Sequence, residues 1–201
     1  MSKTDMKAIP TEYRGYLFRS RLEARWAVFL DALDIRWEYE PEGLILSNGT
    51  YYLPDFYLID FHLYFEVKRK GLRWTEEGRE AIRKISDGMY SDTWAGLICF
   101  GDPMDDELII FCQETDDDGG GCYEDGEVTI GIHPETKEPC LFADDWKERS
   151  FFDSFDSFTP IPVETTLDGK YHYSDFITQR VLQARKKARQ AQFERRYACL
   201  N

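Results

Sequence analysis

The chain has 201 residues, a formal net charge of −13, 42% hydrophobic residues and 15% aromatic residues. This length is typical of one domain with a buried core, and this composition excludes an intrinsically disordered chain. No apolar run approaches the length of a membrane span, and the N-terminus lacks the apolar core of a secretory signal. Five scattered cysteines do not suggest a disulfide framework. We therefore expect a cytoplasmic protein that does not enter membranes.

Residues 1–12 are expected to form a loosely docked arm before the first helix. Ser20 and Glu23 match a capping box, which predicts that this helix begins at Ser20. Apolar residues at helical spacing predict its buried stripe: Leu22, Trp26, Phe29, Leu30 and Leu33. Glu23 borders this stripe, so its side chain is expected to lean over the edge of a sheet.

Two segments rich in aromatic and aliphatic residues, 51–57 and 63–68, are predicted to be the strands of a hairpin. Alternate side chains of a strand share a face, so Glu66 and Lys68 point to the same side. In a suitable register Asp55 lies beside Glu66. Two carboxylates and one ammonium group then converge on one small patch.

Such a patch needs a compensating charge. Two carboxylates about 4 Å apart repel each other by roughly 4 kcal/mol at an effective dielectric constant of ~20. Hard oxygen ligands favour Mg²⁺ or Mn²⁺, which keep several waters and accept further ligands from phosphate. With Lys68 near enough to contact a water or a phosphoryl oxygen, these are the parts of a phosphodiester hydrolase. The alternative is an exposed hairpin that carries an ordinary Glu66–Lys68 surface pair.

The run Pro54-Asp55, followed after ten residues by Glu66-Val67-Lys68, resembles the signature of the PD-(D/E)xK nuclease superfamily. Residues 20–30 resemble the first core helix of its phage and bacterial members. The resemblance covers residues 13–111, about half of the chain. It implies an α/β fold with a restriction-endonuclease-like core, in which helices flank a central mixed sheet. A C-terminal extension that ends in a basic helix would follow this core.

The resemblance also implies a metal-dependent nuclease that acts on DNA and leaves a 5′-phosphate and a 3′-hydroxyl. Asp55, Glu66 and the Val67 carbonyl would hold Mg²⁺ or Mn²⁺, and Glu23 would support a first or second ion. Lys68 would orient the attacking water and stabilise negative charge in the transition state. The predicted catalytic residues are Glu23, Asp55, Glu66 and Lys68. For Glu23 the alternative is the capping box alone. The expected setting is a bacterial or phage-infected cell.

A basic segment with one aromatic residue, 69–74, follows the second strand of the hairpin. It could hold a phosphate backbone and stack on a base, or it could be an ordinary solvated loop. Together with arginines at the start of the first helix, it supplies the predicted nucleic-acid-binding residues: Arg19, Arg21, Arg69, Lys70, Arg73 and Trp74.

Thr75 is the expected cap of a helix that runs from residue 76 towards residue 90. A buried strand is predicted at 94–100 and a further strand at 107–113. The order strand, helix, strand indicates a parallel crossover that covers one face of the sheet.

The chain is predicted to divide into the arm at 1–12, a nuclease-like core at 13–114, an acidic insertion of irregular and β structure at 115–170, and a basic C-terminal segment at 171–201. A strand is expected at 128–132. One helix is predicted from Tyr173 to Tyr197, with Ser174 as a possible cap. Within it, residues 180–196 carry seven Lys or Arg against one Glu. Such a helix could grip nucleic acid, or it could pair with an acidic face of its own domain, of a protein partner or of a second copy.

The acidic balance of the whole chain opposes general attraction to DNA, because non-specific binding depends on Lys and Arg contacts. A different function is therefore open. The chain could be an acidic interaction protein that inhibits a DNA-binding factor by mimicking DNA on a nuclease-like scaffold. The intact trio Asp55, Glu66 and Lys68 argues against this alternative, because a mimic does not need it.

Overall fold

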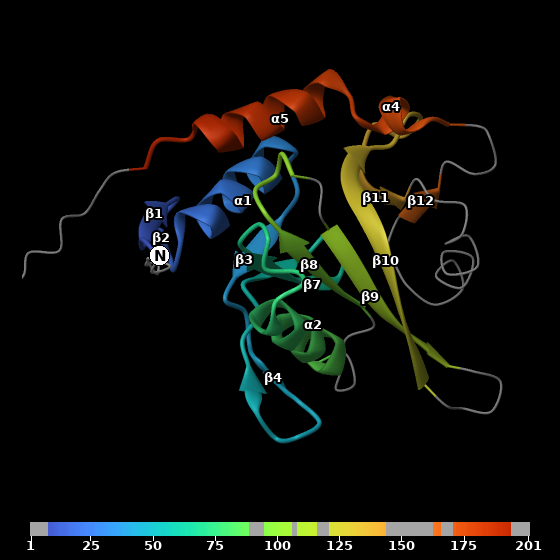
Figure 1. Cartoon of the computed structure of the whole chain (residues 1–201). Coiled ribbons are helices and arrows are strands. Elements are labelled where there is room, and N and C mark those ends of the chain that lie inside the picture. Colours follow the sequence, from blue (N-terminus) through green and yellow to red (C-terminus); the bar gives the residue numbers. More distant parts are fainter. Residues whose placement is uncertain are drawn as a thin grey trace, which may run out of the picture.

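A computed structural model of the chain describes residues 8–88, 95–105, 108–115, 121–143, 163–165 and 171–193. The protein is of the mixed α/β type, with helices flanking a large mixed sheet (Figure 1). Within the described ranges, none of the helices combines the length and the apolar character that crossing a membrane requires.

In the described residues, the main sheet has eight strands in the order β12-β11-β10-β9-β8-β7-β6-β3. Their bounds are β3 (Trp37–Tyr39), β6 (Phe56–Leu58), β7 (Leu63–Lys68), β8 (Ala95–Phe100), β9 (Leu108–Thr115), β10 (Gly121–Ile132), β11 (Pro139–Ala143) and β12 (Val163–Thr165). The pairs β7–β8 and β11–β12 are parallel, and the other neighbours are antiparallel. Two small hairpins stand apart from this sheet, β1 (Thr11–Tyr13) with β2 (Tyr16–Phe18) and β4 (Leu44–Ile45) with β5 (Tyr51–Tyr52).

The helices cover both faces of the sheet (Figure 1). Helices α1 (Arg21–Ala32) and α5 (Gln179–Gln190) lie over one face, and α2 (Glu76–Gly88) lies over the other. Consecutive residues of β8 point to opposite faces and show this division: Leu97 packs in the core beneath α1, and Ile98 packs in the core beside α2. The short α4 (Tyr173–Phe176) lies at the end of β10 and β11.

Helix α1 begins as its sequence predicts. The Ser20 hydroxyl accepts a 3.2 Å hydrogen bond from the Glu23 amide. On the sheet side, the buried Trp26 packs edge-on against Phe65, with 5.0 Å between ring centroids. Its indole N–H donates a 2.9 Å hydrogen bond to the Gly101 carbonyl after β8. This bond fixes α1 against the end of the sheet.

More of α1 is buried than the predicted stripe of residues, because α5 covers a second side of this helix. Ala24 and Val28 are also buried, as are Ala184 and Ala188 on α5. Small alanine side chains allow the two helices to approach closely. Sequence periodicity indicated the side of α1 that faces the sheet, and a distant segment of the chain buries the rest.

The predicted strand 51–57 is two strands. β5 pairs with β4, whereas β6 pairs with β7 in the main sheet. Pro54 has no N–H to donate to a neighbouring strand, so it interrupts the strand. The next residue, Asp55, accepts a 2.9 Å hydrogen bond from the Glu40 amide through its carbonyl. The chain therefore changes direction before β6, and Asp55 lies at its entrance.

The prediction of one helix from Tyr173 to Tyr197 is wrong in the residues that the structure describes. Helix α4 begins at Tyr173, as predicted, but its N-cap is His172 rather than Ser174. It ends before Ile177, where the chain leaves helical geometry. The Phe176 ring is buried and stacks on Phe142, with 4.4 Å between centroids. This packing anchors α4 separately from α5. Residues 194–197 of the predicted helix lie outside the described part.

The predicted crossover is confirmed, because β7 and β8 are parallel neighbours and α2, which lies between them in the sequence, packs on one face of the sheet. The Thr75 hydroxyl caps α2 by accepting from the Gly78 amide at 3.2 Å. Strand β10 is longer than the expected strand at 128–132, since it begins at Gly121 as the partner of β9. Strands β10, β11 and β12 extend the main sheet, and the division into four segments stays a prediction. Residues 1–7 of the arm, residues 116–120 and most of 144–170 lie outside the described residues.

Candidate active site

The candidate site lies where β6 begins and β7 ends. Phe56 is paired with Phe65 in the register of these strands, and one further step places Asp55 opposite Glu66. This is the arrangement that the sequence predicted. Both carboxylates are buried, with exposed fractions of 3% for Asp55 and 5% for Glu66. Two acidic side chains that interact electrostatically are therefore held away from bulk water.

Asp55 is fixed by one backbone donor and one cation. Its Oδ2 accepts a 2.8 Å hydrogen bond from the Val67 amide, and its Oδ1 forms an ion pair with the Arg19 guanidinium. Arg19 also bonds Glu40, with 3.0 Å between Nε and Oε1. Because Arg19 immediately precedes the cap of α1, this helix and the main sheet meet at Asp55.

Glu66 is fixed by two side chains. The buried hydroxyl of Tyr52 donates a 2.8 Å hydrogen bond to Oε2, and the Lys68 ammonium group contacts Oε1. The exposed side-chain fractions are 6% for Glu66 and 25% for Lys68. The alternative of an ordinary exposed Glu–Lys pair is therefore wrong. Tyr52, which the β4–β5 hairpin supplies, covers the carboxylate on this face.

Glu23 lies in the first turn of α1, next to its N-cap Ser20, and faces the site. Its Oε1 accepts from the Ser20 hydroxyl at 2.6 Å, and its Oε2 accepts from the Tyr39 hydroxyl at 2.7 Å. The Arg19 amide donates a further 3.1 Å bond to Oε2. The buried Glu23 carboxylate is thus connected to Asp55 through Arg19. This network gives Glu23 the means to position Arg19.

The electrostatics of the site reflect a shortage of positive charge. Burial and the charge of Glu66 raise the pKa of Asp55 from 3.8 to about 8, although Lys68 and the Val67 amide act in the opposite direction. Burial lowers the pKa of Lys68, but attraction to Glu66 and Asp55 outweighs it and leaves that pKa above 10.5. Burial, with Glu66 next, raises the pKa of Tyr52 well above 10.0. An additional cation would therefore be stabilised here.

The donor set fits a hard divalent cation that keeps part of its water shell. In the described residues, no three His, Cys, Asp or Glu side chains are grouped to hold a metal ion by themselves. Asp55 and Glu66 offer two carboxylates, and the Val67 carbonyl is the third predicted ligand. Continued by two residues, the β6–β7 register places Val67 opposite Pro54, which has no N–H to donate to that carbonyl. Mg²⁺ needs few protein ligands, because waters and phosphate complete its shell.

The predicted nucleic-acid-binding residues fall into two groups. Arg19 contacts Asp55 within the site, and Arg21 is partly exposed in the first turn of α1. The others lie on the loop after β7, where Arg69 faces Glu77 at 4.0 Å and the Lys70 ammonium pairs with Asp105. On the same loop, Arg73 bonds Glu127 at 2.6 Å and Trp74 is 77% exposed.

Neither protein-family models nor curated protein sequences show a match to this chain. Function is therefore inferred from the geometry of the site.

Sequence reasoning missed Tyr39 and Tyr52, which donate to Glu23 and Glu66. Tyr52 lies three residues before Asp55, in a segment read as one strand. Both tyrosines had the aromatic character of core residues, and their hydroxyl groups gave no signal of their own. The structure identifies them as supports of the two carboxylates.

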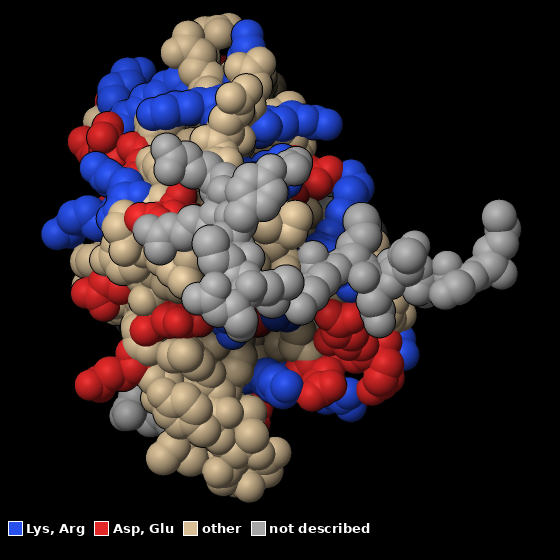
Figure 2. All heavy atoms as spheres, turned by 90° about the vertical axis from the view of Figure 1, so that its left-hand side faces the viewer, with Lys and Arg blue, Asp and Glu red and all other residues tan. Residues whose placement is uncertain are grey.

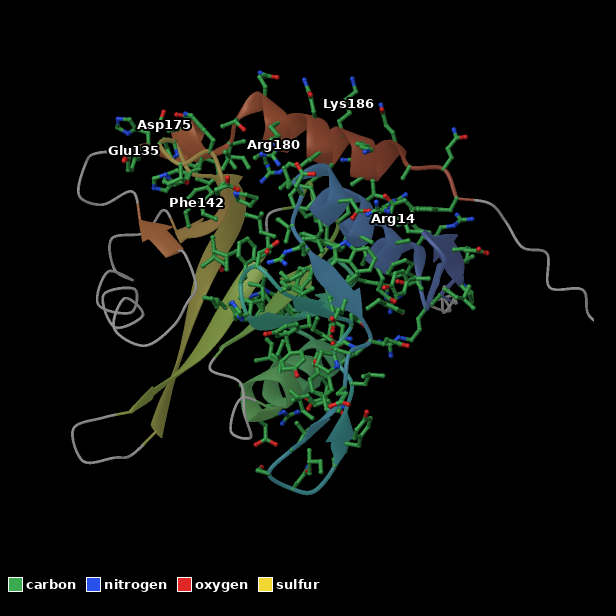
Figure 3. The ribbon with its side chains drawn as sticks, turned by 180° about the vertical axis from the view of Figure 1, so that it is seen from behind. Arg14, Glu135, Phe142, Asp175, Arg180 and Lys186 are labelled. Atoms are coloured by element: carbon green, nitrogen blue, oxygen red, sulfur yellow. The ribbon has the colours of Figure 1, made fainter. Side chains whose placement is uncertain are left out.

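Helix α5 divides its cations between the interior and the surface. Arg180 donates a 2.7 Å bond to the Leu33 carbonyl at the end of α1 and pairs with Asp34 at 2.6 Å. Arg185 is buried, whereas Lys186 points away from α1 (Figure 3). Figure 2 shows Lys and Arg side chains gathered along the top of one face, where α5 lies, above a mixture of acidic and basic residues.

Proposed function

We propose that the chain is a metal-dependent nuclease that hydrolyses phosphodiester bonds of DNA, with a restriction-endonuclease-like core. The observation that carries this proposal is the buried pairing of Asp55 with Glu66 beside the Lys68 ammonium group. A protein gains no stability from burying two opposed carboxylates, so a role for them in binding a cation is the simplest reason for their placement.

Each residue has a distinct part in this proposal. Asp55, Glu66 and the Val67 carbonyl would hold Mg²⁺ or Mn²⁺. When bound, such an ion supplies Lewis-acid polarisation of a phosphoryl oxygen and favours deprotonation of the attacking water. Lys68 orients that water by hydrogen bonding and stabilises the charge that develops on the phosphoryl oxygens. Glu23 positions Arg19, whose guanidinium can turn from Asp55 to a phosphate of the substrate.

The alternative is an acidic inhibitor that mimics DNA, which the net charge of −13 favours. Charges that mimic DNA must face the partner, and Asp55 and Glu66 are almost fully buried. Their burial supports the enzyme over the mimic. In the nuclease proposal, the protein acts in the cytoplasm of a bacterial or phage-infected cell, and the outer face of α5 is left for DNA, a protein partner or a second copy.

The test combines calorimetry with cleavage. We expect Mn²⁺ to bind the wild-type chain, and we expect labelled DNA substrates to be cleaved in its presence. Lys68→Ala should bind Mn²⁺ but cleave about 10²- to 10³-fold more slowly. Binding of Mn²⁺ with no cleavage of duplex, single-stranded or branched DNA would contradict the nuclease proposal, and absence of both would favour the mimic.

A further inference from the structure

The loop between β7 and α2 holds one aromatic ring out in solvent. Trp74 is 77% exposed, the largest exposed fraction among the large hydrophobic residues that the structure describes. Indole rings usually bury most of their surface, because of the large apolar area that they carry. An exposed tryptophan on the loop that follows a strand of the candidate active site therefore calls for a role.

The backbone that carries this ring is firmly held. The Trp74 carbonyl accepts a 3.0 Å hydrogen bond from Arg79, and the Thr75 amide and hydroxyl both donate to the Leu72 carbonyl, at 2.8 and 2.7 Å. A Cβ added at Gly78 would lie 2.0 Å from the Leu72 carbonyl oxygen, so α2 approaches this loop as closely as a glycine allows. The ring is presented by a rigid support.

One face of the Trp74 ring is already occupied. The Arg73 guanidinium carbon lies 4.9 Å from the ring centroid, in a cation–π contact. Arg73 is itself held by Glu127 at 2.6 Å, and its side chain is 19% exposed. This pairing fixes the ring while leaving its other face open to a single flat partner.

The loop also offers charge to a phosphate backbone. Arg69 and Lys70 have exposed side-chain fractions of 54% and 67%, and they pair with Glu77 and Asp105. Surface ion pairs of this kind contribute about 0–1 kcal/mol, so they can exchange for phosphate contacts at little cost. Trp74 follows Lys68 by six residues, a span of at most about 20 Å, so the ring is within a few nucleotides of a phosphate at the site.

We infer that Trp74 is a stacking platform for an unpaired base, and that the DNA recognised at this site has single-stranded character next to the cleaved bond. In a duplex both faces of each base are covered by neighbouring bases, and exposing one costs a few kcal/mol of unstacking. An unpaired base presents its face without that cost. This inference rests on the proposed nuclease function and specifies its substrate class.

The test measures equilibrium binding in the Lys68→Ala background, so that cleavage does not interfere. Two probes are compared: a labelled single-stranded oligonucleotide, and a relaxed, covalently closed circular duplex of the same sequence. Trp74→Ala should weaken binding of the single strand by about 5- to 150-fold, the range for loss of one base–aromatic stack. Binding of the circle should be unchanged. Trp74→Phe should recover part of the loss.

Salt dependence separates stacking from charge. The slope of log K against log salt should be the same for Trp74→Ala and its parent, because no cation is removed. Ile45→Ala, which removes an exposed apolar side chain from the β4–β5 hairpin, is the matched control and should bind like the parent. Equal loss on both probes, or no loss on either, would overturn the inference, and the latter result would point to a protein partner for Trp74. If the parent binds neither probe and the wild type cleaves no DNA, the proposed function fails together with this inference.

Discussion

The hydroxyl of Tyr52 donates a buried 2.8 Å hydrogen bond to Glu66, and this contact joins the β4–β5 hairpin to the candidate site. Tyr52→Phe should lower the affinity for Mn²⁺ by about 10- to 100-fold, the usual effect of losing a hydrogen bond that orients a metal ligand. Titration calorimetry measures this. Tyr51→Phe is a matched control, because the Tyr51 hydroxyl accepts from the Gly43 amide instead. Equal affinities for Tyr52→Phe and its parent would show that this bond does not orient Glu66 for metal binding.

The raised pKa of Asp55 predicts how stability depends on pH. Because that pKa is about 8 in the folded chain and 3.8 when the group is unperturbed, the folded state binds more protons between these values. The free energy of unfolding of the metal-free protein should therefore fall as pH rises from about 4 to about 8. Asp55→Asn should lack this contribution, so its stability relative to wild type should rise by more than about 1 kcal/mol across the window. Urea denaturation in the presence of a chelator measures both curves, and parallel curves would contradict the assigned shift.

The two carboxylates should be essential for cleavage and dispensable for folding. Asp55→Asn and Glu66→Gln preserve size and one acceptor oxygen, replace the other oxygen by an amide NH2 group, and remove one charge each. We expect both variants to lose cleavage and to keep or slightly raise the thermal midpoint without metal, since carboxylate repulsion is relieved. Gel assays of labelled DNA and thermal melts provide the two measurements. If both variants cleave like the wild type, the site is wrongly assigned.

Lys68 should affect turnover without affecting metal binding. Lys68→Ala leaves Asp55 and Glu66 in place and removes their ammonium neighbour, so the affinity for Mn²⁺ should be retained or increased. The cleavage rate should fall by about 10²- to 10³-fold, as is typical when one electrostatic contribution to a transition state is lost. Lys68→Arg should restore little, because a planar guanidinium does not replace a compact ammonium group. Calorimetry and single-turnover cleavage on the same sample measure metal affinity and rate separately. Loss of metal binding in Lys68→Ala would contradict this prediction and give Lys68 a structural role.

The two kinds of cation on α5 should behave differently. Arg180→Gln should lower the free energy of unfolding by about 1 kcal/mol, since Arg180 bonds a carbonyl at the end of α1 and pairs with Asp34. Lys186→Gln, on the exposed side, should change it by less than about 0.5 kcal/mol. Urea denaturation curves compare the two. A larger loss for Lys186→Gln would indicate that the outer face of α5 is an interface, which sedimentation would then reveal as a change in assembly.

The sequence was most informative where local chemistry determines structure. The cap at Ser20, the facing of Asp55 and Glu66 and the parallel crossover after β7 could be predicted, because capping, strand alternation and connection length act within short segments. The resemblance predicted that the two carboxylates and Lys68 form a site, and the structure brings them together with Glu23 and Arg19.

Contacts between distant segments could not be predicted. The break between α4 and α5 depends on the stacking of Phe176 on Phe142. The burial of Ala24 depends on the packing of α5 against α1. The position of the Tyr52 donor depends on where the chain turns at Pro54, which made one predicted strand into two. These features follow from packing that periodicity does not encode.

The order of the site residues along the chain has a consequence for synthesis. From Arg19 to Lys68, every candidate catalytic side chain leaves the ribosome before β8, which begins at Ala95. Until β8 arrives, β7 lacks its parallel neighbour and presents an unpaired apolar edge, the kind that pairs with other chains. A shortened chain ending before β8 would thus keep all of these residues, and it should aggregate rather than work as a minimal enzyme.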